Sequence, residues 1–226
     1  MKPWQTVERV ETPEGRLELR QRGARDFLIM IGGRVLMTSA AHRSEDDLAE
    51  LACAAMVRRP RPRVLIGGLG MGYTLRAALD QLPPAAEVTV VDLNPVVVDW
   101  CRGPLAVLTD HAVTDRRVRV EIGDVAGAIA GAHRGDYDAI LLDLYEGPRP
   151  LPPRAREDPL YGAPASASAW AALRAGGVLA VWAEEPDRSY PLRLRAAGFT
   201  VEVHQGGGRG GRAHVVYLGI RPEKSG

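Results

Sequence analysis

Short segments of alternating apolar and polar residues fill the first sixty positions of the chain. Residues 16–20 alternate with a period of two, and an apolar run over 26–31 is separated from a second run by Gly32 and Gly33. This pattern indicates half-buried strands and a tight hairpin turn, because glycine reaches the positive φ that such turns need. From Ser44 the apolar spacing becomes helical, and a serine followed by acids is typical of a helix N-cap. We therefore predict an N-terminal β-hairpin region and one helix.

From Arg63 onward, apolar runs too short for helices alternate with helical segments. The predicted strands span 64–67, 87–92, 118–122, 137–143, 178–182, 199–204 and 213–220. The predicted helices span 74–82, 95–100, 125–132, 165–174 and 191–197, and Gly176 and Gly177 are expected to close the helix over 165–174. Parallel strands need crossover connections, so the alternation predicts a mainly parallel sheet with helices on both faces. The last two strands are joined by the Gly/Arg-rich loop 206–212 and must be antiparallel.

The predicted fold class is therefore α/β, with a seven-stranded, mostly parallel sheet whose last strand is antiparallel. That ending is typical of the Rossmann-like class I methyltransferase fold and uncommon in dinucleotide dehydrogenases. We expect two parts. Residues 1–60 form the N-terminal β-hairpin and a substrate-side helix, and residues 61–226 form a Rossmann-like domain that binds the cofactor.

Composition narrows the functional class. The chain has 226 residues, 46% of them hydrophobic, and a formal net charge of +1, so it has a core and no overall field that attracts nucleic acid or an anionic membrane. Cys53 and Cys101 belong to no CxxC or Cys/His cluster, which excludes a zinc ribbon and an iron–sulfur site. No signal peptide and no membrane-spanning run is visible. We expect a cytoplasmic protein without a metal.

A glycine-rich turn joins the first parallel strand to the helix that follows it. The sequence Gly67-Gly68-Leu69-Gly70-Met71-Gly72 lets the backbone turn sharply and lets a ligand lie against the main chain. No Gly-Lys-Ser/Thr follows, which excludes a P-loop, and Tyr73 stands where a dinucleotide motif has its third glycine. Together with the antiparallel last strand, this favours an adenosyl sulfonium such as S-adenosylmethionine (SAM) over NAD.

Acidic residues follow three of the parallel strands. Asp92 ends the second strand, 20 positions after Gly72, where a carboxylate accepts ribose hydroxyls. Asp124 follows the third strand and is placed to accept the adenine amino group, and Asp143 ends the fourth. For Asp92 or Asp124 alone, a helix N-cap is an equally good interpretation. The predicted cofactor contacts are Gly68, Leu69, Gly70, Gly72, Asp92, Leu93, Asp124, Val125 and Asp143.

These segments resemble the spermidine synthases, which are polyamine aminopropyltransferases. Residues 64–76, 91–98 and 137–143 are similar to the family's strand motifs in order and spacing, and the resemblance covers roughly residues 28–182. The chain is especially similar to short bacterial proteins called spermidine synthase-like, whose substrates are mostly unassigned. The resemblance implies the class I SAM-dependent methyltransferase superfamily fold, SAM or decarboxylated SAM as cofactor, and a homodimer.

Three departures from the family pattern concern the polyamine site. Aminopropyltransferases carry an acid in the glycine-rich loop, facing the aminopropyl ammonium of decarboxylated SAM, and Met71 holds that place here. Their substrate helix carries a Tyr-His-Glu cluster, whereas this helix reads Glu45-Asp46-Asp47-Leu48. Their catalytic loop reads Asp-x-x-Asp, and here it is Asp143-Leu144-Tyr145-Glu146. The nucleoside site therefore carries over better than the polyamine site.

The fourth strand and its loop carry the candidate catalytic residues. Alkyl transfer from a sulfonium needs in-line attack by a neutral nucleophile. We expect Asp143 to hold an ammonium acceptor and take its proton, with Tyr145 and Glu146 completing an acidic, aromatic-edged pocket. Glu184 and Glu185 either add negative charge or are solvated. No histidine pair has metal-ligand spacing, and the five histidines are predicted at the surface or in hairpins, with His42 the one to test.

Three functions remain open from the sequence. The first is a SAM-dependent methyltransferase acting on a small molecule or peptide, with an amine as one acceptor class. The second is a polyamine aminopropyltransferase that uses decarboxylated SAM. The third is a non-catalytic nucleoside-binding scaffold, against which the retention of Asp92, Asp124 and Asp143 argues. Residues 144–163 form a candidate functional loop in which Arg149, Arg154 and Arg156 either are solvated or clamp an acid.

Overall fold

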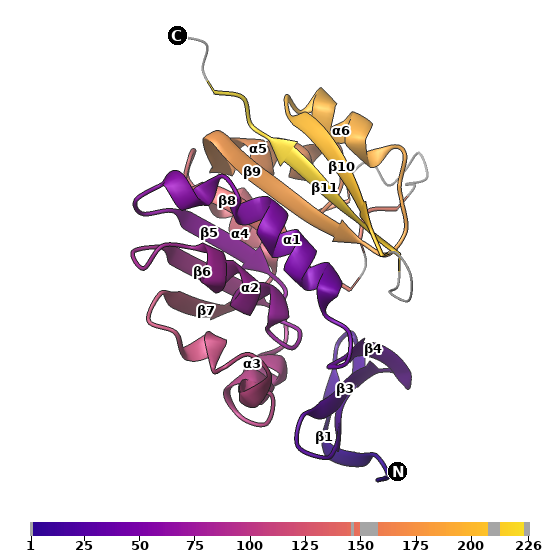
Figure 1. The fold of residues 1–226 in the computed structure, drawn as a ribbon. Helices are drawn as coiled ribbons and strands as arrows, with labels where there is room; N and C mark the ends of the chain where they lie inside the picture. The colour runs from indigo at the N-terminus through magenta and orange to yellow at the C-terminus, as the bar shows by residue number, and fades with distance from the viewer. Residues whose placement is uncertain (1, 146, 150–157, 208–212, 224–226) are drawn as a thin grey trace.

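Two β-sheets organise the molecule (Figure 1). The computed structural model describes residues 2–145, 147–149, 158–207 and 213–223. The first sheet is an antiparallel meander of four strands paired in chain order: β1 (Gln5–Thr12), β2 (Gly15–Arg22), β3 (Asp26–Ile31) and β4 (Arg34–Thr38). The hairpin predicted at Gly32 and Gly33 is confirmed, with φ of +54° and +84°. The predicted hairpin region also contains β1, which the sequence pattern did not reveal.

The second sheet has seven strands in the order β10-β11-β9-β8-β5-β6-β7. Only β11 is antiparallel to its neighbours, β10 and β9, and every other pair is parallel, which confirms the predicted fold class. The strands are β5 (Arg63–Gly67), β6 (Glu87–Asp92), β7 (Val118–Ile122), β8 (Tyr137–Leu142), β9 (Leu173–Ala183), β10 (Thr200–Gly206) and β11 (His214–Ile220).

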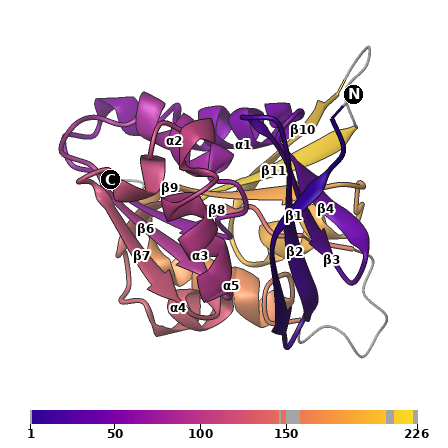
Figure 2. The same ribbon diagram turned by 90° about the horizontal axis from the view of Figure 1, so that it is seen from below.

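Helices cover both faces of the seven-stranded sheet (Figure 2). On one face a hydrophobic cluster joins the sheet to α1 (Arg43–Cys53), α2 (Tyr73–Gln81) and α3 (Pro95–Arg102). On the other face a second cluster joins it to α4 (Val125–Gly131), α5 (Ala163–Ala172) and α6 (Tyr190–Ala196). Three short 3₁₀ turns are η1 (Met56–Arg58), η2 (Ala106–Leu108) and η3 (Ala112–Thr114). None of these helices is long and apolar enough to cross a bilayer.

Two helix ends differ from the prediction. His42 occupies the N-cap of α1, and Ser44 lies inside the helix, where its hydroxyl donates to the Glu45 carboxylate. Gly176 and Gly177, predicted to close a helix, lie within β9. A side chain at Gly177 would crowd the carbonyl oxygen of Asp138, so this glycine allows close strand contact rather than a helix end.

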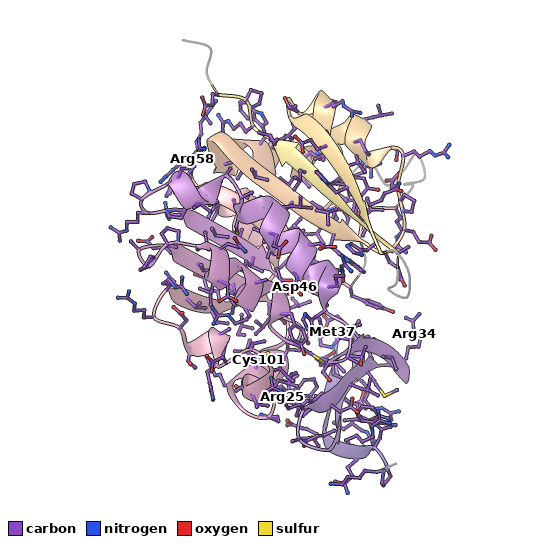
Figure 3. The ribbon with its side chains drawn as sticks, in the orientation of Figure 1. Arg25, Arg34, Met37, Asp46, Arg58 and Cys101 are labelled. Carbon is purple, nitrogen blue, oxygen red and sulfur yellow. The ribbon has the colours of Figure 1, made fainter. Side chains whose placement is uncertain are left out.

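The carboxyl ends of the parallel strands β5, β6, β7, β8 and β9 together form what we call the carboxyl edge. The four-stranded sheet packs beside this edge. Its buried residues, including Leu19 and Phe27, belong to the same cluster as Trp100 of α3. Figure 3 shows Met37 of β4 and Asp46 near the start of α1 at this junction, whereas Arg58, just beyond α1, lies at the far side of the molecule. Helix α1 therefore begins at the carboxyl edge and runs toward the amino ends of the strands.

Candidate functional site

The glycine-rich turn between β5 and α2 forms the centre of the carboxyl edge. Gly68, Gly70 and Gly72 have φ of +87°, +52° and +84°, in the left-handed region that favours glycine. A Cβ at Gly68 would overlap the carbonyl oxygen of Asp143, and one at Gly70 would lie 3.0 Å from the Met37 sulfur. The turn is thus enclosed by the end of β8 and by the four-stranded sheet, and only glycine fits these positions.

Asp92 braces this turn. Its carboxylate accepts hydrogen bonds from the backbone N–H of Leu69 at 2.8 Å and of Asn94 at 2.8 Å. The side chain is buried, and burial is the largest influence on its pKa, which is raised despite these hydrogen bonds. The sequence predicted a ribose contact. The structure shows that the carboxylate first stabilises the glycine-rich turn, and the ribose contact remains a prediction that relies on its remaining acceptor positions.

The other predicted cofactor contacts differ in how far they are exposed. Asp124 is exposed and caps α4, accepting from the N–H of Ala126 at 2.9 Å. Leu93 is 50% exposed directly after β6, whereas the side chains of Leu69 and Val125 are buried. Leu93 therefore offers an apolar surface at the carboxyl edge, and Leu69 and Val125 contribute mainly backbone there.

Asp143 follows β8 and lies against the glycine-rich turn. Its backbone N–H donates to the carbonyl of Gly67 at 2.9 Å, and the Thr74 hydroxyl of α2 donates to its carboxylate. Burial and, after it, the negative charge of Glu45 together raise the pKa of Asp143 to about 7, against the opposing effect of the Thr74 hydrogen bond. The carboxyl group is thus close to half-ionised at neutral pH.

Glu45 is a member of this site that sequence reasoning missed. It lies in the first turn of α1 and is 8% exposed. It precedes Leu48, Ala49 and Ala52 at helical spacing, so it occupies the buried stripe of the helix. The sequence feature that could have identified Glu45 is an acidic residue at a helical position that faces the core. The sequence instead suggested helix capping for this residue.

The carboxylates of Asp143 and Glu45 have no cationic partner among the residues that the structure describes. In the described ranges the other buried acids are held by arginines or by backbone N–H groups, as in Asp92. Glu18, for example, accepts from Arg20 and Arg9, which hold its pKa down to about 2. Asp143 and Glu45 form no ion pair with any described residue, and their side-chain partners are the hydroxyls of Thr74 and Ser44. A buried carboxylate without a cation is unstable in its charged form, so this arrangement favours a cationic ligand.

The loop after β8 is described only in part. Tyr145 is 45% exposed, and the Arg34 guanidinium of β4 lies 5.9 Å from its ring centre. The predicted residue Glu146 lies outside the described residues, as do Arg154 and Arg156. Glu184 and Glu185 are exposed after β9, which agrees with the solvated interpretation.

Histidines join the segment before α1 to the site. His42 stacks on Tyr73 with ring centres 4.3 Å apart and pairs with Asp46 at 2.8 Å, and the Tyr73 hydroxyl donates to the Ser39 carbonyl. Tyr73 therefore holds the connection between β4 and α1. His214 begins β11 in the β10–β11 hairpin, as predicted, and it is buried and pairs with Asp47 at 3.0 Å.

No metal centre is present in the described part of the chain, where no three His, Cys, Asp or Glu side chains converge. Cys101, on α3, donates its thiol to the Gly70 carbonyl at 3.3 Å, and Cys53 is buried in the core. Burial raises the pKa of each thiol to about 12, which leaves both protonated and unreactive at neutral pH.

Comparison with known proteins places this geometry in a family. The family model described as the spermine/spermidine synthase domain matches residues 43–190, which include α1, the glycine-rich turn, Asp92, Asp124 and Asp143. This range contains all four acidic residues discussed above for the carboxyl edge: Glu45, Asp92, Asp124 and Asp143.

Curated relatives include two kinds of enzyme. Putrescine N-methyltransferase 4 of Nicotiana tabacum is 36% identical over 128 residues, covering 55% of this chain and 31% of that protein. The polyamine aminopropyltransferase of Mycobacterium tuberculosis is 29% identical over 190 residues, covering 80% of this chain and 34% of that protein. The chain spans about a third of the length of the curated relatives it matches.

Solved structures share the fold. A spermidine synthase in complex with the transition state analogue AdoDATO has a TM-score of 0.75 at 17% identity, covering 96% of this chain and 72% of that chain. The spermidine synthase of Thermotoga maritima has a TM-score of 0.73 at 17% identity, with the same coverage. At this identity the likeness shows the fold.

Proposed function

Because the chain belongs to the spermine/spermidine synthase family, we propose that it transfers a methyl group from SAM to an amine acceptor. Family membership implies SAM or decarboxylated SAM as the cofactor. One observation supports the amine most directly: the carboxyl of Asp143 lies half-buried at the carboxyl edge and has no cation beside it among the described residues. An ammonium group supplies the charge that is missing there.

The residues at the carboxyl edge fit an adenosyl cofactor. Gly68 and Gly70 are only half-buried, so part of their main chain is accessible at the turn, and the exposed side chain of Leu93 offers an apolar contact for an adenine ring. Asp92 and Asp124 would hold the ribose and the adenine amino group through acceptor positions that their backbone hydrogen bonds leave open. When bound, SAM supplies the methyl carbon: the amine lone pair forms the new C–N bond while the C–S bonding pair returns to sulfur.

Asp143 prepares the nucleophile. Ionised, it binds the ammonium form of the acceptor, and with a pKa of about 7 it is basic enough to take one proton and leave a neutral amine. Thr74 fixes the carboxylate by its hydrogen bond, so the proton is taken at a defined place. After transfer the acid stabilises the positive charge that develops on nitrogen.

Methyl transfer is favoured over aminopropyl transfer by the glycine-rich turn. The resemblance to aminopropyltransferases implies an acid there for the aminopropyl ammonium, and this chain has Met71, whose side chain is fully buried in the core. The side chain at this position thus offers no carboxylate to a second ammonium. Similarity to putrescine N-methyltransferases over 55% of the chain supports the same choice.

Aminopropyl transfer from decarboxylated SAM is the second candidate. It is favoured by the similarity to a polyamine aminopropyltransferase, which extends over 80% of this chain. Both candidates use the same Asp143 chemistry and differ in the cofactor. The cofactor preference therefore separates them.

Calorimetric titration with SAM and with decarboxylated SAM tests the proposal, followed by mass analysis of an amine mixture incubated with each cofactor. We expect tighter binding of SAM and products that gain one methyl group. Tighter binding of decarboxylated SAM, with products that gain an aminopropyl group, overturns methyl transfer in favour of the second candidate. Failure to bind either cofactor favours a scaffold.

A further inference from the structure

We propose that Trp182 is a specificity-determining residue beside Asp143 and that its indole N–H pairs with a neutral oxygen on the acceptor molecule. The acceptors are then amino alcohols, amino ethers and amino amides, which bind more tightly than alkyl amines or diamines without oxygen. This inference deepens the proposed function and rests on it, because it requires that an amine bind next to Asp143.

The register of the sheet places Trp182 beside Asp143. Strands β8 and β9 are parallel neighbours with Leu142 opposite Val181, so Asp143 and Trp182 follow at the same level. Asp143 faces α2, because its carboxylate accepts from the Thr74 hydroxyl of that helix. Trp182 faces the same side, since it packs against the hydrophobic cluster that joins the sheet to α1 and α2. Adjacent strands lie about 4.8 Å apart, so the indole and the carboxyl group are side-chain neighbours at the carboxyl edge.

The indole N–H of Trp182 has no hydrogen-bond acceptor among the described residues. Its nitrogen is buried, although Trp182 as a whole is half-buried and one side of the residue is accessible at the carboxyl edge. A buried donor without a partner destabilises a protein, and native structures rarely retain one without a role. A ligand bound beside Asp143 relieves this cost when it brings an acceptor atom to the indole.

A second unpaired indole provides the comparison. In the described part of the chain the only other buried side-chain nitrogen or oxygen without a partner is Nε1 of Trp170. Trp170 belongs to α5 and packs on the opposite face of the sheet, with the Arg221 guanidinium 3.7 Å from its ring centre. Trp182 is therefore the one of the two that adjoins the proposed acceptor site.

The charges beside Trp182 determine which kind of atom pairs with it. Asp143 is negative when ionised, and the charge of Glu45 acts on the same place, since it opposes that ionisation. Both acids repel a ligand carboxylate, including that of SAM. An ammonium group has N–H donors and no acceptor, so a protonated diamine leaves the indole unpaired. A hydroxyl, ether or amide oxygen accepts the hydrogen bond without carrying charge.

Binding at two points also orients the acceptor. The nitrogen lies at Asp143 and the oxygen at Trp182, so the chain between them has one direction along the carboxyl edge. An acceptor without oxygen is held at its nitrogen alone and rotates about that contact. Because in-line transfer depends on orientation, we expect the oxygen to increase the rate of methyl transfer as well as the affinity.

Three pairs of amines with equal chain length test the oxygen. They are 2-methoxyethylamine with butylamine, 3-methoxypropylamine with pentylamine, and 4-methoxybutylamine with hexylamine. In each pair an ether oxygen, which accepts a hydrogen bond but donates none, replaces one CH₂ group. Calorimetry is done with S-adenosylhomocysteine present, which has no methyl group to transfer. We expect the wild-type protein to bind at least one ether about tenfold more tightly than its alkyl partner.

Two changes at position 182 remove the N–H in different ways. Trp182→Phe keeps an aromatic ring, and site-specific incorporation of 3-benzothienylalanine replaces the N–H by sulfur in a ring of nearly the same shape. Both proteins should lose the ether preference. Trp170→Phe is the matched control, because it removes the other unpaired indole N–H, and it should keep the preference. Thermal unfolding with and without S-adenosylhomocysteine identifies any variant that is misfolded.

The indole resonance supplies a readout that a merely structural role would not change. The chain has four tryptophans, so a proton–nitrogen-15 spectrum contains four indole signals, and the spectrum of Trp182→Phe assigns one of them. We expect the Trp182 indole proton to move downfield when the preferred ether binds, because a hydrogen bond deshields it. The alkyl partner should leave this signal close to its position in the free protein.

Each failure has a distinct meaning. Equal affinities within all three pairs overturn the oxygen requirement and leave the proposed function intact. An ether preference that persists in both position-182 proteins overturns the role of Trp182. If the changes at position 182 weaken binding of SAM and not of decarboxylated SAM, the N–H serves the cofactor carboxylate and the proposal is wrong. A wild-type protein that binds SAM and none of the six amines overturns the amine acceptor together with this inference.

Discussion

Strand β8 has a buried aspartate near its start and is followed directly by a half-buried one, and the two carboxylates have opposite kinds of partner. Asp138, at the start, is fully buried and pairs with Arg59 at 2.6 Å and Arg174 at 3.3 Å, and it accepts from the N–H of Arg63 at 2.7 Å. Asp143, at the end, has a hydroxyl partner and no cation among the described residues. Asp138 is thus neutralised by two arginines, whereas the Asp143 carboxyl has no positive charge beside it among the described residues.

The contrast indicates a structural role for Asp138 and supports the functional role that we propose for Asp143. The cleft beside Asp138 has a volume of about 560 Å³, and its arginines Arg59, Arg61 and Arg63 already pair with acids of the chain. These ion pairs connect residues 59–63, at the amino end of β5, to the amino ends of β6 and β8. At the carboxyl edge the fold instead tolerates an uncompensated carboxyl, which is costly unless a ligand supplies the cation.

The largest expected effect is on turnover at the carboxyl end. Asp143→Asn keeps the shape and the Thr74 contact but removes the base, and we expect methyl transfer to fall by about 10²–10⁴-fold. The affinity for SAM should stay within a few fold, and thermal stability should not decrease, because a charge that burial disfavours is lost. Single-turnover kinetics and calorimetry measure these quantities. Unchanged turnover would remove Asp143 from the mechanism.

Substitution of Asp138, at the amino end of β8, should reduce stability and leave SAM binding unchanged. Asp138→Asn leaves Arg59 and Arg174 without their anion, and we expect a loss of about 2 kcal/mol in the free energy of unfolding, less than for fully buried pairs because both guanidiniums are partly exposed. SAM affinity of the folded protein should not change. Urea unfolding checks the first expectation and calorimetry the second. Equal stability losses in Asp138→Asn and Asp143→Asn would break the comparison.

A smaller effect is expected from Leu93→Ala. This side chain is half-exposed, so its removal should cost little stability, while the lost apolar contact should weaken SAM binding by about tenfold or less. Val203→Ala, which truncates another exposed apolar residue on β10, serves as the control and should leave SAM affinity unchanged. Equal affinities for both variants would place the adenine elsewhere.

The sequence predicted the seven-stranded sheet well because buried strands and amphipathic helices leave strong periodic signals. Strand β1 escaped because most of its residues are exposed and show no apolar alternation. Gly176 and Gly177 were misread because a glycine pair signals a helix end as readily as close packing within a strand.

The site residues likewise include some that the sequence predicted and some that it did not. Asp143 was found because a strand end is a local feature of the chain. Glu45 was missed because its importance depends on Asp143, 98 positions away, and only the packing of α1 on β8 brings the two together. Asp92 was assigned to a ligand, whereas its nearest partners are backbone N–H groups of the glycine-rich turn and its own turn.

The most direct test of the central claim is the carbon-13 NMR titration of the Asp143 carboxyl, with Asp143→Asn for assignment. A pKa raised in the folded state means that this group stabilises the protein fully below the pKa of the unfolded chain, near 3.8, and loses that contribution as pH rises through about 7. We predict a midpoint near 7 in the free protein that shifts downward when butylamine binds, because the cation favours the carboxylate. A midpoint near 3.8 that butylamine does not move would contradict the account.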